Sequence, residues 1–415
     1  MQTALADFVK DTAAGREAQD ILRSCVHCGF CLPACPTYQL LGDELDSPRG
    51  RIYLIKQLLE GTPAGPATRL HLDRCLTCRA CESACPSGVR YGRLVDIGRE
   101  LTERQLPRSP AGALRRYLLR KVLPRRARVQ LLLGAARSMR WLLPRALRAQ
   151  LPPVPAATAL AWPAARHARR VLLLPGCVQP ALAPTIDAAA ARVLDRIGIS
   201  ALPATSAGCC GALAHHLGAA ADARAQLRRN VDALWGAIEA GAEAIIQTSS
   251  ACTAMLGDYG RYLAHDARYA ERAARLSTRV RDLSAVLSGE GAALRAALRA
   301  APPPRAPFRV AFQAPCSLQH ALKADALVAD LLRAAGYELT AVSDGQRCCG
   351  AAGTYALLQP QLSQRLLRAK VSALEAQAPE LIATANIGCL QHLRAATRLP
   401  VRHWVELLDA RLAGG

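Results

Sequence analysis

The chain has 415 residues, of which 51% are hydrophobic and 4% aromatic, and a formal net charge of +21. This length is enough for about two to four domains. Scarce aromatic residues argue against stacking on nucleic acid, so we expect no nucleic-acid partner. The N-terminal segment lacks the pattern of a secretory signal, and the longest apolar runs fall far short of the roughly 20 residues that span a bilayer. We therefore expect a soluble or peripheral protein.

The 16 cysteines are the most informative residues of the sequence. Without a secretion signal they indicate a reducing compartment, where cysteines bind metal or perform redox chemistry instead of forming structural disulfides. They fall into four sets of four with none left over, whereas free core cysteines would scatter. The first two sets lie before residue 90 and the other two after residue 170.

The first two sets share the spacing C-x2-C-x2-C-x3-C-P, in "CVHCGFCLPACP" and "CLTCRACESACP". Three closely spaced thiolates surround one cluster, and in two-cluster ferredoxins the fourth cysteine binds the other cluster. We therefore expect two interlocked [4Fe–4S] clusters. The predicted ligands are Cys25, Cys28, Cys31 and Cys85 for the first cluster and Cys75, Cys78, Cys81 and Cys35 for the second. Zinc is disfavoured because structural zinc sites prefer two C-x2-C pairs on either side of a longer loop.

The segment between these motifs is predicted to be a turn followed by a helix. "SPRG" is typical of a helix start, and an apolar stripe follows it at Ile52, Ile55, Leu58 and Leu59. Asp43, Glu44 and Asp46 lie among Gly, Ser and Pro, so we interpret them as a solvated turn and not as a carboxylate metal site. His27, between two predicted ligands, is interpreted in the same way as a solvated loop residue.

Residues 106–165 are predicted to form a basic helical connector. No acidic residue occurs between Glu103 and Asp187, and Leu118, Leu119, Val122 and Leu123 alternate with cations at roughly helical spacing. Pro124 and Pro144 prevent one long helix. A basic amphipathic segment can lie on an anionic membrane surface or against an acidic partner, or it can pack on its own protein. These three alternatives stay open.

The remainder of the chain is an internal duplication. "VLLLPGCVQPAL", "SAGCCGALAHHLG" and "IIQTSSACTAML" correspond to "VAFQAPCSLQHAL", "GQRCCGAAGTYAL" and "LIATANIGCLQHL". Strands that alternate with helices predict a parallel sheet in each copy. The fold class is therefore multidomain α+β and α/β. We expect a helical two-cluster ferredoxin-like domain (1–105), the connector (106–165), and two cysteine-rich α/β domains (166–300 and 308–415) separated by the Pro-rich linker 301–307.

Each copy carries an adjacent cysteine pair followed by glycine. The two sets are Cys177, Cys209, Cys210 and Cys252, and Cys316, Cys348, Cys349 and Cys389. Four of these eight residues are expected where strands end, and sites in parallel sheets form at that edge. Three interpretations of these thiols stay open: metal ligands, redox disulfides, or small buried hydrophobic groups.

These patterns resemble those of iron–sulfur subunits of membrane-associated flavin dehydrogenases and of heterodisulfide reductases. The segments "CVHCGFCLPACPTYQLLGDELDSPRGRIYLIKQLLEG" and "HLDRCLTCRACESACPSGVRYGRLVDIGRE", with the endings "TSSAC" and "TANIGC", more narrowly resemble the family of glycolate oxidase iron–sulfur subunits. The heterodisulfide-reductase pattern has a fifth cysteine, where this chain has Met255 and His392. That departure speaks against a large noncubane cluster, although His392 offers a replacement ligand.

The resemblance implies an electron-relay subunit of a flavin-dependent glycolate (2-hydroxy acid) dehydrogenase. A separate flavin-bearing subunit would oxidise glycolate to glyoxylate, and this chain would pass the electrons toward a quinone or another carrier. The sequence has no G-x-G-x-x-G after a strand, in agreement with a flavin on another chain, and we assign no catalytic residue to this one. The alternatives are a thiol–disulfide reductase that acts at the cysteine pairs and a non-enzymatic scaffold. We expect a cytoplasmic location, either free or peripheral on the inner face of the membrane.

Overall fold

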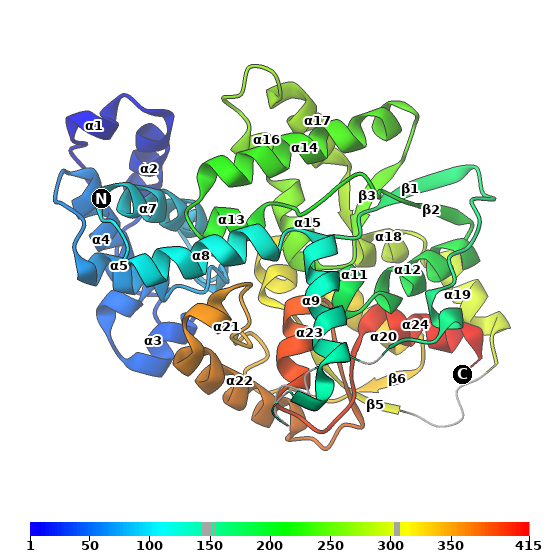
Figure 1. Cartoon of the computed structure of the whole chain (residues 1–415). Helices are drawn as coiled ribbons and strands as arrows, with labels where there is room; N and C mark the ends of the chain where they lie inside the picture. The colour runs from blue at the N-terminus through cyan, green and yellow to red at the C-terminus, as the bar shows by residue number, and fades with distance from the viewer. Residues whose placement is uncertain (143, 145–150, 153, 303–307, 415) are drawn as a thin grey trace.

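The structure, a computed structural model, describes residues 1–142, 144, 151–152, 154–302 and 308–414 (Figure 1). Most of the predicted linker (303–307) and part of the predicted connector (143, 145–150 and 153) lie outside the described residues. No helix in the described part of the chain is both long enough and apolar enough to span a membrane.

The N-terminal region is built from helices and loops. Ser47 caps the helix that follows the predicted turn, because its side chain accepts a hydrogen bond from the backbone N–H of Gly50. Ile52, Ile55, Leu58 and Leu59 on this helix are all buried, which confirms the predicted apolar stripe. The elements are α1 (Asp7–Lys10), α2 (Ala13–Arg23), α3 (Pro36–Leu41), η1 (Glu44–Asp46), α4 (Pro48–Leu59), α5 (Pro66–Asp73), α6 (Ala80–Ser83) and α7 (Tyr91–Gln105).

The basic segment forms surface helices that connect the two halves of the molecule (Figure 1). It comprises α8 (Pro110–Val122), α9 (Arg126–Ser138), η2 (Arg140–Leu142) and η3 (Ala157–Leu160). Pro124 lies between α8 and α9, as predicted. Helix α8 pairs with the N-terminal region through Arg116 and Asp73 (2.9 Å) and with the first repeat through Arg120 and Asp222 (3.3 Å).

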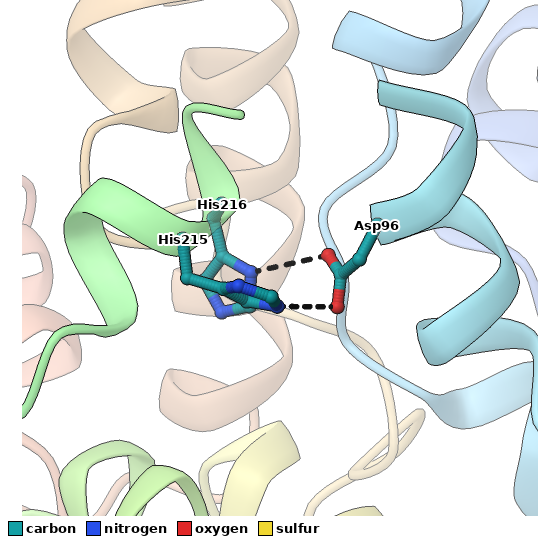
Figure 2. A group of neighbouring side chains, drawn as sticks. All are labelled: Asp96, His215 and His216. Atoms are coloured by element: carbon teal, nitrogen blue, oxygen red, sulfur yellow. Dashed lines mark hydrogen bonds and ion pairs between the residues drawn. The ribbon is translucent and has the colours of Figure 1, made fainter. Parts of the chain in front are cut away.

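The N-terminal region also contacts the first repeat directly. Asp96 on α7 faces His215 on α13 (Ala212–His216), and the carboxylate and the ring nitrogen are 2.8 Å apart (Figure 2). Nearby, Arg79 pairs with Asp258 of the first repeat at 3.1 Å. The two contacts fix the predicted ferredoxin region against the first repeat.

Each repeat contains a four-stranded parallel sheet, which confirms the predicted parallel arrangement. In register, Leu172 pairs with both Leu202 and Ile245, and Ala311 pairs with Ile382. The sequence pattern revealed only two strands per copy, whereas the structure adds β2, β4, β6 and β8. The first sheet has the order β2 (Ile199–Pro203), β1 (Arg169–Leu173), β3 (Ala244–Gln247), β4 (Val280–Asp282) and the second β6 (Tyr337–Leu339), β5 (Phe308–Gln313), β7 (Leu381–Thr384), β8 (Val401–His403).

Helices cover both sheets. The first repeat has α11 (Gln179–Leu182), α12 (Thr185–Arg196), α13, α14 (Ala220–Glu239), α15 (Ser250–Gly257), α16 (Tyr259–Tyr262), α17 (Ala270–Arg279), α18 (Leu283–Gly289) and α19 (Gly291–Ala300). The second has the π-helical turn η4 (Ser317–Leu322), α20 (Asp325–Ala334), α21 (Tyr355–Leu358), α22 (Pro360–Glu375), α23 (Ile387–Arg394) and α24 (Trp404–Ala413).

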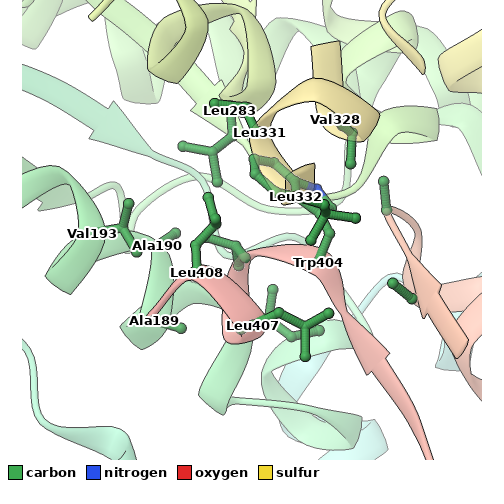
Figure 3. Close-up of a cluster of buried hydrophobic side chains, with 14 of the residues drawn as sticks. Ala189, Ala190, Val193, Leu283, Val328, Leu331, Leu332, Trp404, Leu407 and Leu408 are labelled. Atoms are coloured by element: carbon green, nitrogen blue, oxygen red, sulfur yellow. The ribbon is translucent and has the colours of Figure 1, made fainter. Parts of the chain in front are cut away.

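The two repeats share one hydrophobic core. Val193 on α12, Leu332 on α20 and Trp404 on α24 belong to a single cluster of buried side chains that includes residues of both sheets (Figure 3). Arg192 of the first repeat pairs with Asp409 of the second at 2.6 Å at the edge of this cluster. Because burial of each such apolar side chain contributes about 1.5–3 kcal/mol, the shared core holds the two cysteine-rich repeats in a fixed relation.

Candidate metal centres

The first cysteine loop lies between α2 and α3. His27 and Gly29 have positive φ angles of 56° and 86°, so the backbone curls and directs the thiols inward. A cavity beside this loop is lined by Cys25, Cys28, Cys31, Cys81 and Cys85. The structure therefore brings Cys81 and Cys85, both from the second motif, to the thiols of the first. His27 itself is exposed to solvent, as predicted.

The second cysteine loop lies between α5 and α7 and has the same kind of backbone. Thr77 and Arg79 have positive φ angles of 54° and 61°. The adjoining cavity is lined by Cys35, Cys75, Cys78 and Cys81, so the last cysteine of the first motif lies with the thiols of the second. Cys35 is placed there because it precedes Pro36, the first residue of α3.

The chemistry of these cavities suits metal binding. Burial raises the pKa of the Cys78 and Cys81 thiols well above the ordinary value, and burial raises the pKa of Cys31 to about 11. Without metal these thiols keep their protons. A metal cluster would displace the protons, because thiolate is the form that binds metal. Together the two adjoining cavities are lined by eight different cysteines, which is the number of ligands that two cubane clusters need.

A buried ionic network supports the second cavity. Arg51 donates hydrogen bonds to Asp46 Oδ1 and Thr37 Oγ1 (both 3.1 Å), and its Nη1 lies 3.9 Å from Cys35 Sγ. Arg74 pairs with the other oxygen of Asp46 at 2.8 Å. The interpretation of Asp46 as part of a solvated turn is wrong, since its side chain is fully buried, whereas Asp43 is exposed as predicted. Asp46 is occupied by guanidinium groups and is not available to a cation.

The four cysteines of the first repeat lie together. Hydrogen bonds from the thiols of Cys177 and Cys210 hold the pKa of Cys209 well below its ordinary value. The pair is held from behind, because Asn230 Nδ2 donates to the Cys209 carbonyl (2.9 Å) and the Tyr259 hydroxyl donates to the Cys210 carbonyl (2.8 Å). Cys252 lies in the first turn of α15, just after β3. The repeat therefore presents one compact group of thiols near the carboxyl ends of its strands.

The second repeat presents the matching group. Cys349 Sγ and Cys389 Sγ are 3.3 Å apart, and Cys316 and Cys348 are close enough for a thiol hydrogen bond that raises the pKa of Cys316. His392, which stands where the related pattern has its fifth cysteine, has its Nε2 3.0 Å from Ser363 Oγ. Met255, at the corresponding place in the first repeat, is buried and packs near Gly211.

The structure also reveals a relation that the sequence could not show. Cys78 of the second motif packs in one hydrophobic cluster with Cys316 and Cys348 of the second repeat, together with Leu76 and Tyr355. The cavity of the second motif thus borders the thiol group of the second repeat. No local pattern links these positions, which are more than 200 residues apart in the sequence.

Comparison with known proteins identifies the parts of the chain. A family model described as a 4Fe-4S dicluster domain matches residues 21–89, and a model described as a cysteine-rich domain matches residues 171–257 and 310–394. Over its whole length the chain is 50% identical to the glycolate oxidase iron–sulfur subunit of Escherichia coli K12, with 99% of each chain covered. The chain belongs to the family of glycolate oxidase iron–sulfur subunits.

More distant relatives agree with this family. The probable glycolate oxidase iron–sulfur subunit of Bacillus subtilis is 31% identical over 90% of this chain and 88% of its own length. Lactate utilization protein A of Bacillus velezensis is 26% identical over 58% of this chain and 100% of its own length. The glycolate oxidase iron–sulfur subunits thus match 90–99% of this chain, whereas the lactate utilization protein matches 58% of it.

Proposed function

We propose that this chain is the electron-transfer subunit of a flavin-dependent glycolate dehydrogenase. It receives electrons from a flavin-bearing subunit that oxidises glycolate to glyoxylate, and it passes them toward a quinone or another carrier. The observation that carries the proposal is the pair of adjoining cysteine-lined cavities. Family membership supplies the identity of the complex.

The chain's own residues have defined tasks in this function. Cys25, Cys28, Cys31 and Cys85 would hold one [4Fe–4S] cluster and Cys75, Cys78, Cys81 and Cys35 the other. When bound, such clusters take up and release one electron at a time. Oxidation of glycolate to glyoxylate releases two electrons and two protons, so the complex must divide the electron pair into single transfers.

The surroundings of the second cavity favour a cluster that accepts electrons. Arg51 places a buried positive charge beside Cys35, and the Tyr91 hydroxyl lies 3.6 Å from Cys75 Sγ. Positive charge and hydrogen bonds near cluster sulfur stabilise the reduced form. The border with Cys316 and Cys348 gives an onward route from this cavity to the second repeat. We therefore infer that electrons leave the ferredoxin-like region on the side of Cys78.

The relay is tested by following the iron–sulfur absorbance anaerobically. We expect glycolate to bleach this absorbance when the flavin-bearing subunit is present and to leave it unchanged with this chain alone, because the chain lacks a dinucleotide fingerprint. As a control, dithionite added to the chain alone should bleach the absorbance, which shows that the clusters can accept electrons. Bleaching by glycolate without the partner, or none with a partner whose flavin is reduced, would contradict the proposal.

A catalytic thiol–disulfide reaction in the repeats is the second candidate function. The 3.3 Å separation of Cys349 Sγ and Cys389 Sγ favours it, since oxidation of these two thiols to a disulfide needs little movement. A cysteine pair that acted in this way would exchange two electrons with a disulfide substrate. In the relay experiment, this candidate predicts disulfide reduction by the dithionite-reduced chain without its partner.

We also propose that α8 and α9 attach the protein to an anionic membrane surface. No residue of α8 is buried, and Leu131 and Leu132 on α9 are 74% and 56% exposed. Arg125 and Arg128 are exposed beside them, and the sequence from Arg104 to Ile186 contains no acidic residue. Apolar side chains among cations suit the interface of an anionic bilayer better than water.

Membrane attachment is tested by co-sedimentation with vesicles. We expect binding to phosphatidylglycerol-containing vesicles, little binding to pure phosphatidylcholine, and at least a tenfold loss of binding when Leu131 and Leu132 are both replaced by aspartate. Phe8→Asp is the matched control, because Phe8 on α1 is 49% exposed outside this surface. Equal binding of the double variant would contradict the proposal, and capture by an acidic protein alone would favour a protein partner.

The division into domains 1–105, 106–165, 166–300 and 308–415 remains our proposal. Its support is the order of elements: strands occur in the described residues only from Arg169 onward, and each repeat has its own sheet. The shared core argues that the two repeats fold together as one unit.

A further inference from the structure

A group of potential metal ligands lies away from all 16 cysteines, where α7 of the N-terminal region meets α13 of the first repeat. Figure 2 shows Asp96 on one side and His215 and His216 on the other, with both rings directed at the carboxylate. His215 Nε2 is 2.8 Å from Asp96 Oδ2, and His216 Nδ1 is 3.7 Å from Asp96 Oδ1. The three potential ligand atoms lie within 4.8 Å of one another.

The carboxylate is buried and incompletely paired. The side chain of Asp96 is 3% exposed, and its Oδ1 atom is buried without a hydrogen-bond partner. In the part of the chain that the structure describes, Asp96 forms ion pairs with these two histidines and with no arginine or lysine. An unpaired buried carboxylate oxygen is costly, so this oxygen points to a missing partner.

Asp46 shows how the chain completes a buried carboxylate with its own residues. There Arg51 and Arg74 each contact one oxygen, at 3.1 and 2.8 Å. Asp96 Oδ1 has no such guanidinium partner among the described residues. It faces the ring of His216, whose Nδ1 lies 3.7 Å away, too far for a hydrogen bond. Two ligands on one tetrahedral zinc ion, with bonds of about 2.0–2.1 Å, lie about 3.3 Å apart. The 3.7 Å gap is close to that separation, whereas His215 Nε2, now in a direct 2.8 Å hydrogen bond with Asp96 Oδ2, would move outward to bind the same ion.

We propose that Asp96, His215 and His216 bind one divalent first-row metal ion, with zinc as the ion to test. Two imidazoles and one carboxylate form a ligand set that zinc accepts, and the remaining position would take water. The side chain of His216 is 41% exposed, so the ion reaches the site from solvent. The ring of His215 packs on Tyr262 at 4.4 Å between centroids, which fixes its orientation.

A metal ion at this site would hold the N-terminal region against the first repeat, and both regions carry cysteine groups of the proposed electron path. Helix α13 begins directly after Gly211, which follows the cysteine pair of the first repeat, and α7 follows the second cysteine motif. The duplication places Thr354 and Tyr355 where the first repeat has His215 and His216, so the second repeat lacks both imidazoles. Tyr355 is instead buried in the cluster that contains Cys78. The metal site is thus a property of the first interface alone.

The experiment is metal analysis of the full chain with its iron–sulfur clusters, after exposure to micromolar zinc and removal of free metal. We expect about one zinc per chain in addition to iron, and a zinc K-edge X-ray absorption spectrum with nitrogen and oxygen ligands at about 2.0–2.1 Å and no sulfur at about 2.3 Å. His216→Asn should weaken zinc binding at least tenfold and leave the iron content unchanged. His265→Asn, at an exposed histidine of the same repeat, is the matched control.

Three results would overturn the proposal. They are the absence of zinc from wild-type chain with full iron content, zinc bound through sulfur, and zinc binding that His216→Asn and His215→Asn leave unaltered. The absorption spectrum of the wild type decides the ligands even if a variant fails to fold. None of these results bears on the relay, which is tested without zinc.

Discussion

Replacing Cys35 with serine will remove the cluster whose other ligands are Cys75, Cys78 and Cys81, and will leave the cluster at Cys25, Cys28 and Cys31 in place. This result is expected because Cys35 belongs to the first motif in sequence but lines the cavity of the second. Cys85 lies conversely at the cavity of the first motif. Since two cubane clusters contain about eight irons, the variant should lose about four of them.

Electron paramagnetic resonance of the dithionite-reduced variants identifies which cluster survives. The spectrum of Cys35→Ser should match that of Cys75→Ser, and the spectrum of Cys85→Ser should match that of Cys25→Ser. Glycolate-dependent electron transfer in the complex should fall at least a hundredfold in each variant, because an interrupted chain of centres cannot carry electrons onward. A Cys35→Ser spectrum that matched Cys25→Ser would mean that each motif holds its own cluster.

The architecture was largely predictable because its signals are local. The doubled C-x2-C-x2-C-x3-C-P motif and the repeated cysteine pair each specify a loop from a few neighbouring residues. Three of the four strands that the sequence did not reveal, β4, β6 and β8, have three residues each, too few for a period to emerge, whereas β2 has five. All four form because a neighbouring strand offers a parallel partner, β1 to β2, β3 to β4, β5 to β6 and β7 to β8, which is a tertiary effect.

The parts of the sites that escaped prediction depend on distant residues. Asp96 and His215 are 119 positions apart, and no pattern in either segment indicates the contact. Asp46 was predicted to be solvated because it lies among turn-forming residues. Its burial depends on Arg51, which lies one turn inside the following helix, and on His71 and Arg74 from another segment. Charged residues are almost never fully buried unless they are paired, and here the tertiary fold brings the paired residues together.

Asp46→Asn is expected to destabilise the N-terminal region severely. Asp46 is fully buried and the side chain of Arg51 is 1% exposed, so the substitution leaves a buried guanidinium without its counter-charge. Breaking a buried ion pair in this way costs about 3–5 kcal/mol. In a region of about 100 residues, a loss of that size lowers the midpoint of thermal unfolding by at least about 10 °C. Thermal unfolding of the cluster-loaded chain, followed by circular dichroism and iron–sulfur absorbance, measures it.

The second cluster should be lost before the first, because the buried ion-pair network of Asp46 contacts its predicted ligand Cys35. Thr37 Oγ1 donates to the Asp46 carbonyl oxygen (2.8 Å), accepts from Arg51 (3.1 Å) and lies 3.2 Å from Cys35 Sγ. On heating, the second cluster should therefore be released first. Its electron paramagnetic resonance signal, which is also absent from Cys35→Ser, should disappear before the signal of the first cluster. Asp43→Asn, at an exposed aspartate of the same turn, is the control. It should change the midpoint by less than about 4 °C, because surface substitutions usually alter stability by at most about 0.5 kcal/mol. If Asp46→Asn unfolded at the same temperature as Asp43→Asn, the buried network would not be what holds Cys35 in the second cavity.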